Sequence, residues 1–531
     1  MPFFNFYNFL FGNNVNGSDK SDLIIGTFGK DHLNGNGGDD LIFGLFGDDK
    51  ISGGDGEDHL DGGSGNDVIV GNKGNDKMFG GHGNDLLVWN NGDGSDLMDG
   101  GKGYDAVQVN FNTDLVNDDL QNKDVAEFSS TEYGVQFARI EVNDQTERGL
   151  FQLDIRNTET LETNFGGGDD TAVLKGDVLN DIYLDLDGGK GVDTLDLSQV
   201  ADGVNVNLKA GKLDGSTAQN FENVIGTAYD DTIKGDNQDN EISGLDGADK
   251  IFGRSGDDTL VGGKGDDIVK GGQGDDDLVW NNGDGSDLMD GGKGNDLVQV
   301  NFDTDLVNDD LQNKDVAEFS VTDKGVAFAR IEVNDQTERG LFNLDVRNTE
   351  TLETNFGGGE DTAVLVDNIL DKIVLDLDGG AGIDTLDFSQ LSSAVEVDLA
   401  AGTMASAGGT KTSTAVNFEN IEGTAFDDTI TGDDQDNVIR GGAGNDVMQG
   451  GEGADTFVFF EEDQGVDVIL DFELGVDSLA FFTTDPDVTT ENLLGNMTQN
   501  GDHVDMTLNN KVVTFENTSI ADFSADDFLI M

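Results

Sequence analysis

Residues 17–88 consist of eight nonapeptides in tandem: GSDKSDLII, GTFGKDHLN, GNGGDDLIF, GLFGDDKIS, GGDGEDHLD, GGSGNDVIV, GNKGNDKMF and GGHGNDLLV. Each unit begins with glycine, most have glycine again at the fourth position, and all have aspartate sixth and a large apolar residue eighth. The sixth positions are Asp22, Asp31, Asp40, Asp49, Asp58, Asp67, Asp76 and Asp85, and the eighth are Ile24, Leu33, Ile42, Ile51, Leu60, Ile69, Met78 and Leu87.

A period of nine with one apolar residue per unit fits neither an amphipathic helix nor a long alternating strand. The first six positions are turn formers, because glycine permits positive φ and aspartate tolerates tight backbone geometry. The last three positions are long enough for a very short strand only. Two units then form one coil, and the pattern predicts that successive coils stack as a right-handed parallel β-roll with the eighth residues inside.

Stacked coils place the sixth-position carboxylates above one another, where like charges repel. One apolar residue per unit also buries too little surface to offset the entropy lost when nine residues are ordered. Ca²⁺ removes the repulsion, because it binds six to eight oxygens from carboxylates and backbone carbonyls. The pattern therefore predicts that calcium is needed to fold the roll.

The units resemble the GGxGxDxUx nonapeptide of RTX (repeats-in-toxin) proteins, a calcium-binding parallel β-helix repeat. Eight units in one register make the resemblance specific, whereas a flexible glycine-rich linker would predict neither the aspartates nor the apolar eighth positions. The resemblance implies a secreted protein that binds several Ca²⁺ ions through its sixth-position aspartates.

The same pattern recurs along the chain. Two extra residues, Trp89 and Asn90, shift the register, and the pattern then resumes at Asn91. It returns as a single unit at Gly188 and forms further arrays from Gly226 and Gly423. Asn240 and Asn437 replace aspartate in the second units of these later arrays, so weaker sites or edge caps are expected there. The additional calcium candidates are Asp96, Asp105, Asp193, Asp231, Asp249, Asp258, Asp267, Asp276, Asp287, Asp296, Asp384, Asp428, Asp446 and Asp455.

An internal duplication organises the chain, with an offset of 191 residues between Trp89 and Trp280 and between Asp193 and Asp384. Alternating apolar residues in VQFARIEV (135–142) and GLFQLDIR (149–156) predict a hairpin or small meander in each copy. The fold class expected is all-β. The predicted order is an aromatic N-terminal cap (1–16), a first array (17–108), a first β insert (109–187), a degenerate repeat with strands (188–225), a second array (226–299), a second insert (300–378), another degenerate segment (379–422), a third array (423–458) and a C-terminal cap with secretion signal (459–531).

The composition of the chain limits the classes of partner that it can bind. The 531 residues have a formal net charge of −79, so neither nucleic acid nor an anionic membrane is expected as a partner. Cysteine is absent, and no segment is long and apolar enough to span a bilayer. Low hydrophobicity and this charge predict disorder without calcium. The aromatic N-terminus is a poor Sec signal; it is interpreted as a cap on the first coil, with a docking segment as the alternative.

Two C-terminal segments carry further resemblances to RTX proteins. DVILDFELGVDSLAF (467–481) resembles the segment that closes the roll, and the last 28 residues, from Val504, resemble an uncleaved type I secretion signal. An ordinary β end-cap is a compatible alternative. The resemblance implies export by the type I secretion apparatus to an extracellular location.

Catalysis is not expected. The histidines His32, His59, His82 and His503 form no zinc-binding spacing, and no GxSxG elbow occurs. RTX exoproteins usually carry an effector domain ahead of the repeats, and here only sixteen residues precede the first unit, so neither toxin nor hydrolase activity is expected. Carboxylate pairs, which glycosidases use, occur throughout the chain, but the repeat geometry accounts for nearly all of them. A secreted enzyme with an unrecognised site in an insert stays an alternative.

The inserts concentrate scarce positive charge at Arg139, Arg148 and Arg156, and at their duplicates Arg330, Arg339 and Arg347. Arginine suits bidentate recognition of carboxylates on acidic polysaccharides. Internal pairing with neighbouring acids is the alternative that we favour. The function expected is a non-enzymatic, calcium-dependent surface, matrix or adhesive component, acting by self-association at the cell surface; an acidic-polysaccharide-binding module is the first alternative.

Overall fold

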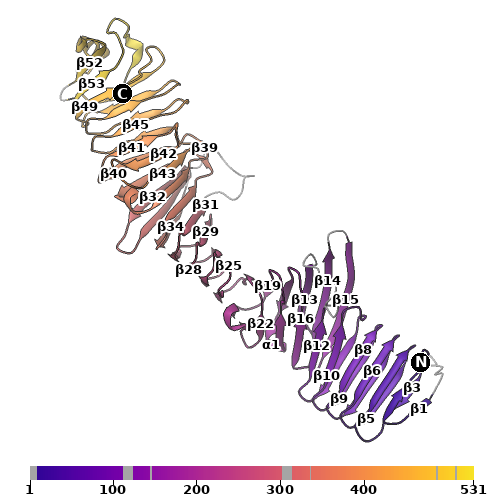
Figure 1. Ribbon diagram of the computed structural model, residues 1–531. Helices are drawn as coiled ribbons and strands as arrows, with labels where there is room; N and C mark the ends of the chain where they lie inside the picture. Colours follow the sequence, from indigo (N-terminus) through magenta and orange to yellow (C-terminus); the bar gives the residue numbers. More distant parts are fainter. Residues whose placement is uncertain are drawn as a thin grey trace. The chain divides into compact units, whose positions relative to one another are not determined.

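The computed structural model describes residues 9–111, 123–143, 146–301, 314–334, 337–485, 488–508 and 511–531. The chain forms two units, residues 1–261 and residues 262–531, each built almost entirely of stacked strands (Figure 1). Within each unit most neighbouring strands are parallel, so the predicted all-β parallel roll is confirmed.

The first array forms the rungs of two facing sheets. One sheet contains β1 (Phe9–Phe11), β3 (Leu23–Ile25), β5 (Leu41–Phe46), β7 (His59–Ser64), β9 (Lys77–His82) and β11 (Leu97–Lys102). The other contains β2 (Asn14–Asn16), β4 (His32–Gly37), β6 (Lys50–Asp55), β8 (Val68–Lys73), β10 (Leu86–Asn90) and β12 (Ala106–Asn110). Leu41 pairs with His59 on one sheet and Lys50 with Val68 on the other, so two nonapeptides form one coil as predicted.

The strands of the array are longer than the sequence pattern predicts. Strand β5, for example, runs from the seventh position of one unit through the third position of the next, over six residues. The first glycines of a unit continue the strand because each stacked coil offers backbone partners on both sides, which overrides the turn preference of glycine. The eighth-position residues from Ile24 to Leu87 are at most 2% exposed, so they form the expected interior ladder.

The slip at Trp89 adds a large side chain to the interior. Leu86 pairs with Ala106, so this coil contains two residues more than the coils before it. Trp89 is fully buried, and its indole N–H donates to the carbonyl oxygen of Gly94 at 2.8 Å. The ring packs against Phe111 and Phe151. The roll therefore widens here into an aromatic core.

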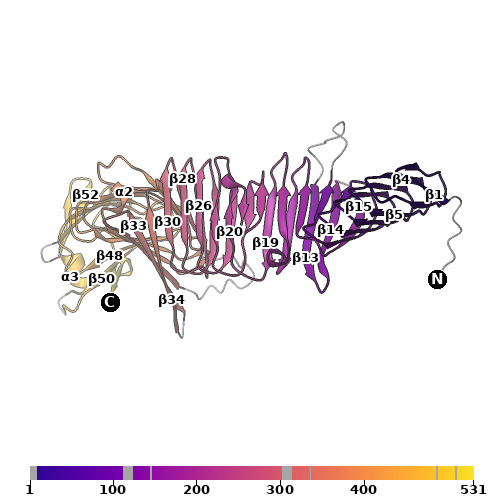
Figure 2. The same ribbon diagram turned by 90° about the horizontal axis from the view of Figure 1, so that it is seen from below.

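The first insert is an antiparallel meander of β13 (Lys123–Thr131), β14 (Gly134–Asn143) and β15 (Thr146–Arg156). It is not a separate body, because β15 pairs in parallel with β11, and β13 pairs in parallel with β17 (Thr171–Gly176). Figure 2 shows the meander in line with the array rungs. The alternation of apolar residues predicted β14 and β15. It did not predict β13, nor the pairing of β15 with β11 and of β13 with β17 that joins the meander to the roll.

Unit 1 continues as a roll after the meander. Its remaining elements are β16 (Thr160–Asn164), α1 (Val178–Asp181), β18 (Tyr183–Asp187), β19 (Thr194–Val200), β20 (Asn205–Asn207), the 3₁₀ turn η1 (Leu208–Ala210), β21 (Lys212–Leu213), β22 (Thr217–Gln219), β23 (Asn223–Ile225), β24 (Thr232–Lys234), β25 (Glu241–Asp246), β26 (Lys250–Ser255) and β27 (Thr259–Lys264) at its boundary.

Unit 2 repeats this plan, with the meander β32–β33–β34 joined to β30 and β37. Its elements up to the third array are β28 (Ile268–Gln273), β29 (Asp277–Asn281), β30 (Leu288–Lys293), β31 (Leu297–Asn301), β32 (Lys314–Val321), β33 (Val326–Asn334), β34 (Thr337–Arg347), β35 (Thr351–Asn355), β36 (Gly358–Gly359), β37 (Thr362–Asp367), α2 (Ile369–Lys372), β38 (Val374–Asp378), β39 (Ala381–Gly382), β40 (Thr385–Leu391), β41 (Val395–Asp398), β42 (Thr403–Ser406), β43 (Ser413–Val416), β44 (Asn420–Glu422), β45 (Thr429–Thr431), β46 (Val438–Arg440) and β47 (Val447–Gln449).

The C-terminal segment continues the stack rather than covering it. Strand β53 pairs in parallel with β49, and β54 with β50. Phe472, Phe515 and Phe523 form an aromatic core beneath them. The elements are β48 (Thr456–Phe460), β49 (Gly465–Ile469), β50 (Ser478–Phe482), α3 (Thr490–Gly495), β51 (Met497–Asn500), β52 (His503–Leu508), β53 (Lys511–Phe515), the 3₁₀ turn η2 (Ala525–Asp527) and β54 (Phe528–Ile530).

At the N-terminus, β1 and β2 occupy the first coil, and Phe9 and Phe11 are 65% and 66% exposed. The rest of the predicted aromatic cap, Phe3, Phe4, Phe6 and Tyr7, lies outside the described residues. The longest helix in the described ranges, α3, has six residues, and none of the described helices could cross a bilayer.

Candidate metal centre

The sixth-position aspartates form hydrogen-bonded ladders along the edges of the roll. The backbone N–H of Asp40 donates to Oδ1 of Asp58 at 2.7 Å, and the N–H of Asp58 donates to Oδ1 of Asp76 at 2.8 Å. Each carboxylate thus accepts a bond from the sixth-position residue one coil earlier. All 22 candidate aspartates are at most 4% exposed, so the structure brings the predicted residues into buried columns.

The second carboxylate oxygen of most interior aspartates has no hydrogen-bond donor. Among the described residues nothing donates to it, although it is fully buried, and a buried carboxylate oxygen left in this state is costly. The aspartates with such an Oδ2 include Asp40, Asp49, Asp58, Asp67, Asp76, Asp85, Asp96, Asp105, Asp193, Asp296, Asp384, Asp446 and Asp455.

The first glycine of each unit makes room beside this oxygen. A Cβ atom on Gly53 would overlap both Oδ2 of Asp58 and the carbonyl oxygen of Gly71 in the next coil, and Gly35 has the same surroundings with Asp40 and Gly53. A carboxylate oxygen and a backbone carbonyl oxygen therefore converge at the same place in successive coils. This explains why glycine occupies the first position.

Burial makes the carboxylates hard to ionise. It raises the pKa of Asp58 to about 7, and the neighbouring Asp76 carboxylate adds to the rise against the lowering effect of the Asp40 N–H bond. Burial likewise raises the pKa of Asp40 and Asp96 to about 7. The columns therefore need nearby positive charge if they are to be fully ionised at neutral pH.

These features fit calcium. Oxygens from carboxylates and backbone carbonyls are the ligands that Ca²⁺ prefers. Within the described ranges no three acidic, histidine or cysteine side chains converge on one point. Backbone carbonyl oxygens such as that of Gly71, which lies close to Oδ2 of Asp58, would supply further ligands. A bound Ca²⁺ would neutralise the stacked carboxylates and link neighbouring coils. The assignment of individual aspartates as ligands stays a prediction.

The ends of the ladders differ from their interior. At Asp31 the Thr27 N–H bonds to Oδ2 and the Thr27 hydroxyl bonds to Oδ1 at 2.8 Å, whereas at Asp22 Ser18 makes both bonds to Oδ2. Thr227 makes the same two hydrogen bonds to Asp231, and Thr424 makes them to Asp428. The aspartates at the ladder ends are therefore Asp22, Asp31, Asp231 and Asp428. Asp31, Asp231 and Asp428 have both carboxylate oxygens in hydrogen bonds, so they present less to a cation than interior aspartates.

Asn240 and Asn437 also lie at ladder ends. The amide of Asn240 donates to the carbonyl oxygen of Glu222 at 2.9 Å and accepts from the N–H of Asp236 at 2.9 Å. Asn437 makes the equivalent bonds. The position requires a side chain that donates on one side and accepts on the other. An amide does both, whereas an ionised carboxylate can only accept. The geometry fits the edge-cap alternative.

The ladders contain four aspartates that the sequence analysis missed: Asp170, Asp361, Asp467 and Asp477. Asp170, Asp467 and Asp477 each accept from a backbone N–H one coil earlier, as Asp467 does from Asp446 at 3.2 Å and Asp477 from Asp455 at 3.0 Å. Asp361 donates its own N–H to Oδ1 of Asp384 at 2.7 Å, as the other ladder residues do. The units of these four aspartates have glycine fourth and an apolar residue eighth but lack the first glycine. The shorter signal GxDx followed by an apolar residue would have found them.

Other candidate residues give simpler outcomes. Arg156 pairs with Asp154 and Arg347 with Asp345, in line with the internal pairing that we favoured. The side chains of Arg139, Arg148, Arg330 and Arg339 lie outside the described part. His59 packs between the rings of Phe43 and Phe79.

Comparison with known proteins supports the calcium interpretation. The model of the RTX calcium-binding nonapeptide repeat matches residues 16–51, 52–87, 225–260, 252–279, 281–308 and 422–457. The arrays are RTX repeats. Proteins with RTX repeats bind Ca²⁺ and are typically secreted.

No curated protein sequence matches the chain. Among solved structures, the chain is similar to the extracellular lipase LipA from Serratia marcescens, with 16% identity and a TM-score of 0.18. The similarity covers 65% of this chain and 45% of the lipase chain, so less than half of the length of the lipase is spanned.

Acidification is expected to increase the structure of the calcium-free RTX arrays. The folded-state pKa of Asp58 and Asp76 is about 7, above the ordinary value of 3.8. The folded chain therefore binds more protons than the unfolded chain between about pH 4 and 7, and its stability falls as pH rises through this window. Circular dichroism in EDTA should show more strand at pH 5.5 than at pH 8.

Added NaCl at pH 8 is the control, because it screens the net charge without protonating the columns. Equal strand signal at both pH values in EDTA would contradict the prediction. In saturating Ca²⁺ the trend should reverse, because protons compete with the ion.

Proposed function

We propose that the chain is a secreted RTX protein that crosses the cell envelope unfolded, folds on extracellular Ca²⁺, and then serves as a non-enzymatic structural component of the cell surface or matrix. The observation that carries the proposal is the column of buried carboxylates with one oxygen lacking a hydrogen bond. Extracellular calcium modules bind at about 10⁻⁴ to 10⁻³ M, so such columns would stay empty inside the cell and fill outside it.

The chain's own residues have clear parts in this function. Interior aspartates such as Asp58 offer one oxygen to the backbone of the preceding coil and leave the other for the ion. Gly53 admits the ion beside that oxygen. Thr27 and Asn240 close the ends of the ladders. When bound, Ca²⁺ neutralises the columns and joins successive coils.

Cell fractionation tests the surface role. In calcium-containing medium the protein should remain with the cell surface or matrix, and washing with EDTA should release it. An Mg²⁺ wash of equal ionic strength is the control, because Mg²⁺ demands stricter octahedral geometry. Recovery of the protein in the free medium at every calcium concentration would contradict the surface role without affecting the calcium-binding part.

Export through the type I apparatus predicts that removal of residues 472–531 keeps the chain inside the cell. A deletion of three whole coils within the first array, residues 35–88, is the control and should leave export intact. Normal export of the C-terminal deletion would refute this part of the proposal.

A further inference from the structure

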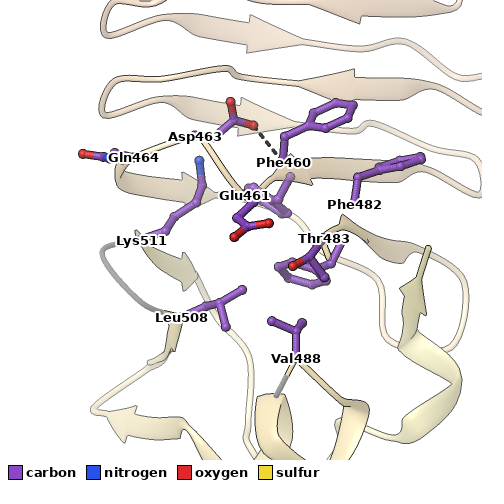
Figure 3. Close-up of a pocket in the computed structure, with 11 residues that line it drawn as sticks. Phe460, Glu461, Asp463, Gln464, Phe482, Thr483, Val488, Leu508 and Lys511 are labelled. Atoms are coloured by element: carbon purple, nitrogen blue, oxygen red, sulfur yellow. Dashed lines mark hydrogen bonds between the residues drawn. The ribbon is translucent and has the colours of Figure 1, made fainter. Parts of the chain in front are cut away.

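One buried lysine lies at the end of a calcium column. Lys511, the first residue of β53, is 6% exposed, and its Nζ lies 2.7 Å from Oδ2 of Asp467. Nζ also donates to the carbonyl oxygen of Gly442 at 3.4 Å and lies 5.0 Å from the ring centroid of Phe459. Figure 3 shows the side chain of Lys511 reaching from its strand toward the turn that contains Asp463 and Gln464.

Asp467 occupies a ladder position. Its Oδ1 accepts from the N–H of Asp446, and the residues that follow the two aspartates, Val447 and Val468, pair with each other. Neither Oδ2 of Asp467 nor Oδ2 of Asp446 accepts a hydrogen bond of good geometry among the described residues, but Oδ2 of Asp467 lies 2.7 Å from the ammonium of Lys511 and forms an ion pair with it. The ammonium thus contacts the carboxylate oxygen that interior units leave for calcium.

The register shows how the lysine reaches this place. Lys511 pairs with Gly465, and Gly465 is the fourth-position glycine of the degenerate unit that contains Asp467. Gly465 in turn stacks closely on Gly444, the fourth glycine of the preceding coil. Strand β53 therefore takes the place of the next coil, with a cation-bearing residue where a repeat unit would have glycine.

The ammonium contacts the two kinds of oxygen that calcium binds. It touches Oδ2 of Asp467 and the carbonyl oxygen of Gly442 in the coil before Asp467, whereas at interior positions such as Gly53 the carbonyl beside Oδ2 of Asp58 belongs to Gly71 of the next coil. A buried carboxylate without a counter-charge is strongly destabilising, and a buried ammonium is stable only when it is paired. Each charge here requires the other.

The neighbouring column also ends without a need for metal. Oδ1 of Asp477 accepts from the N–H of Asp455, and Oδ2 accepts from the N–H of Glu473 at 2.7 Å. Both last ladder aspartates of the chain therefore have their two oxygens in contact with groups of the protein. Below them the aromatic core around Phe515 gives the final coil an apolar interior of its own.

We propose that the Lys511 ammonium replaces the last calcium ion of its column, so that the C-terminal coil folds without metal and offers a preformed end on which the third array stacks when Ca²⁺ arrives. This inference rests on the proposed calcium-driven folding of the arrays.

Hydrogen exchange of the full chain, followed by mass spectrometry, tests the inference. In EDTA, peptides from residues 456–482 and 503–515 should be protected, whereas peptides from the first array should exchange freely. Lys511→Met should abolish protection of the C-terminal peptides in EDTA, because Asp467 would be buried without a counter-charge. The double variant Lys511→Met with Asp467→Asn should restore it, because both charges are then removed.

Lys73→Met is the matched control, since the side chain of Lys73 is 73% exposed and pairs with the exposed Asp55. It should leave the C-terminal peptides unchanged. Free exchange of the wild-type C-terminal peptides in EDTA, retained protection in Lys511→Met, or no rescue in the double variant would each overturn the inference. Protection of the first-array peptides in EDTA would instead refute calcium-driven folding, so the two failures are distinguishable.

Discussion

Removal of calcium is expected to unfold the RTX arrays. A pH of 8 is above the raised pKa values of the interior carboxylates, which are about 7 for Asp58 and Asp76. Without calcium the columns would therefore carry uncompensated buried charge. The formal net charge of −79 adds a general repulsion that opposes compaction. Far-UV circular dichroism should show loss of the strand signal in EDTA and its return in millimolar Ca²⁺.

A pair of variants separates calcium binding from simple charge removal. Asp58→Asn removes an interior carboxylate with an Oδ2 that lacks a hydrogen bond, and should raise the calcium midpoint of folding by roughly tenfold, because an interaction with a charged group contributes about 1.5–3 kcal/mol. Asp31→Asn removes the same charge at a ladder end where Thr27 occupies the carboxylate, and should shift the midpoint far less. Equal shifts, or full strand signal in EDTA, would contradict the prediction.

Gly65→Ala is expected to be among the most damaging single substitutions in the first array. Gly65 has φ +140°, and a Cβ there would overlap the carbonyl oxygen of Gly47 in the preceding coil. Backbone strain of this kind costs about 1–3 kcal/mol, and the overlap adds to it by forcing two coils apart. The thermal midpoint in saturating Ca²⁺ should fall, and the calcium midpoint should rise.

Gly29→Ala is the matched control, because Gly29 occupies the same fourth position of its unit but lies in the first coil that is built from nonapeptide units. A Cβ on Gly29 would meet nothing within 4 Å, and its φ is not in the positive region. Alanine should be tolerated there, or stabilise by about 0.4–1 kcal/mol through the unfolded state. A similar loss for both variants would show that glycine is needed for reasons other than stacking.

The periodic features of the fold were predictable because each unit repeats the same local physics. The eighth-position residues and the sixth-position aspartates lie where the pattern placed them, and two units form each coil. The sequence pattern could not reveal the backbone bonds between successive aspartates, because these depend on how coils stack rather than on any one unit. Hydrogen bonding at Thr27 and Asn240 was hidden for the same reason.

The non-periodic features needed the structure. Alternation indicated the hairpin of the first insert, but the pairing of β15 with β11 joins residues 97 and 154, and no local signal specifies such a partner. Lys511 lies 44 residues after Asp467 in a segment without the glycine register, so only the stacking of β53 on β49 brings the two together. Unmatched units such as the one around Asp170 were missed because they begin with phenylalanine.

The coil of two nonapeptides constrains how the length of an array can change during evolution. Because Leu41 pairs with His59 one full coil later, a deletion of eighteen residues removes one rung from each sheet and leaves all later pairings intact. A deletion of nine residues would instead transfer every later strand of the unit to the opposite sheet, and β11, together with the meander that β15 joins to it, would then extend that opposite sheet. Viable insertions and deletions in the first array should therefore come in multiples of two repeats.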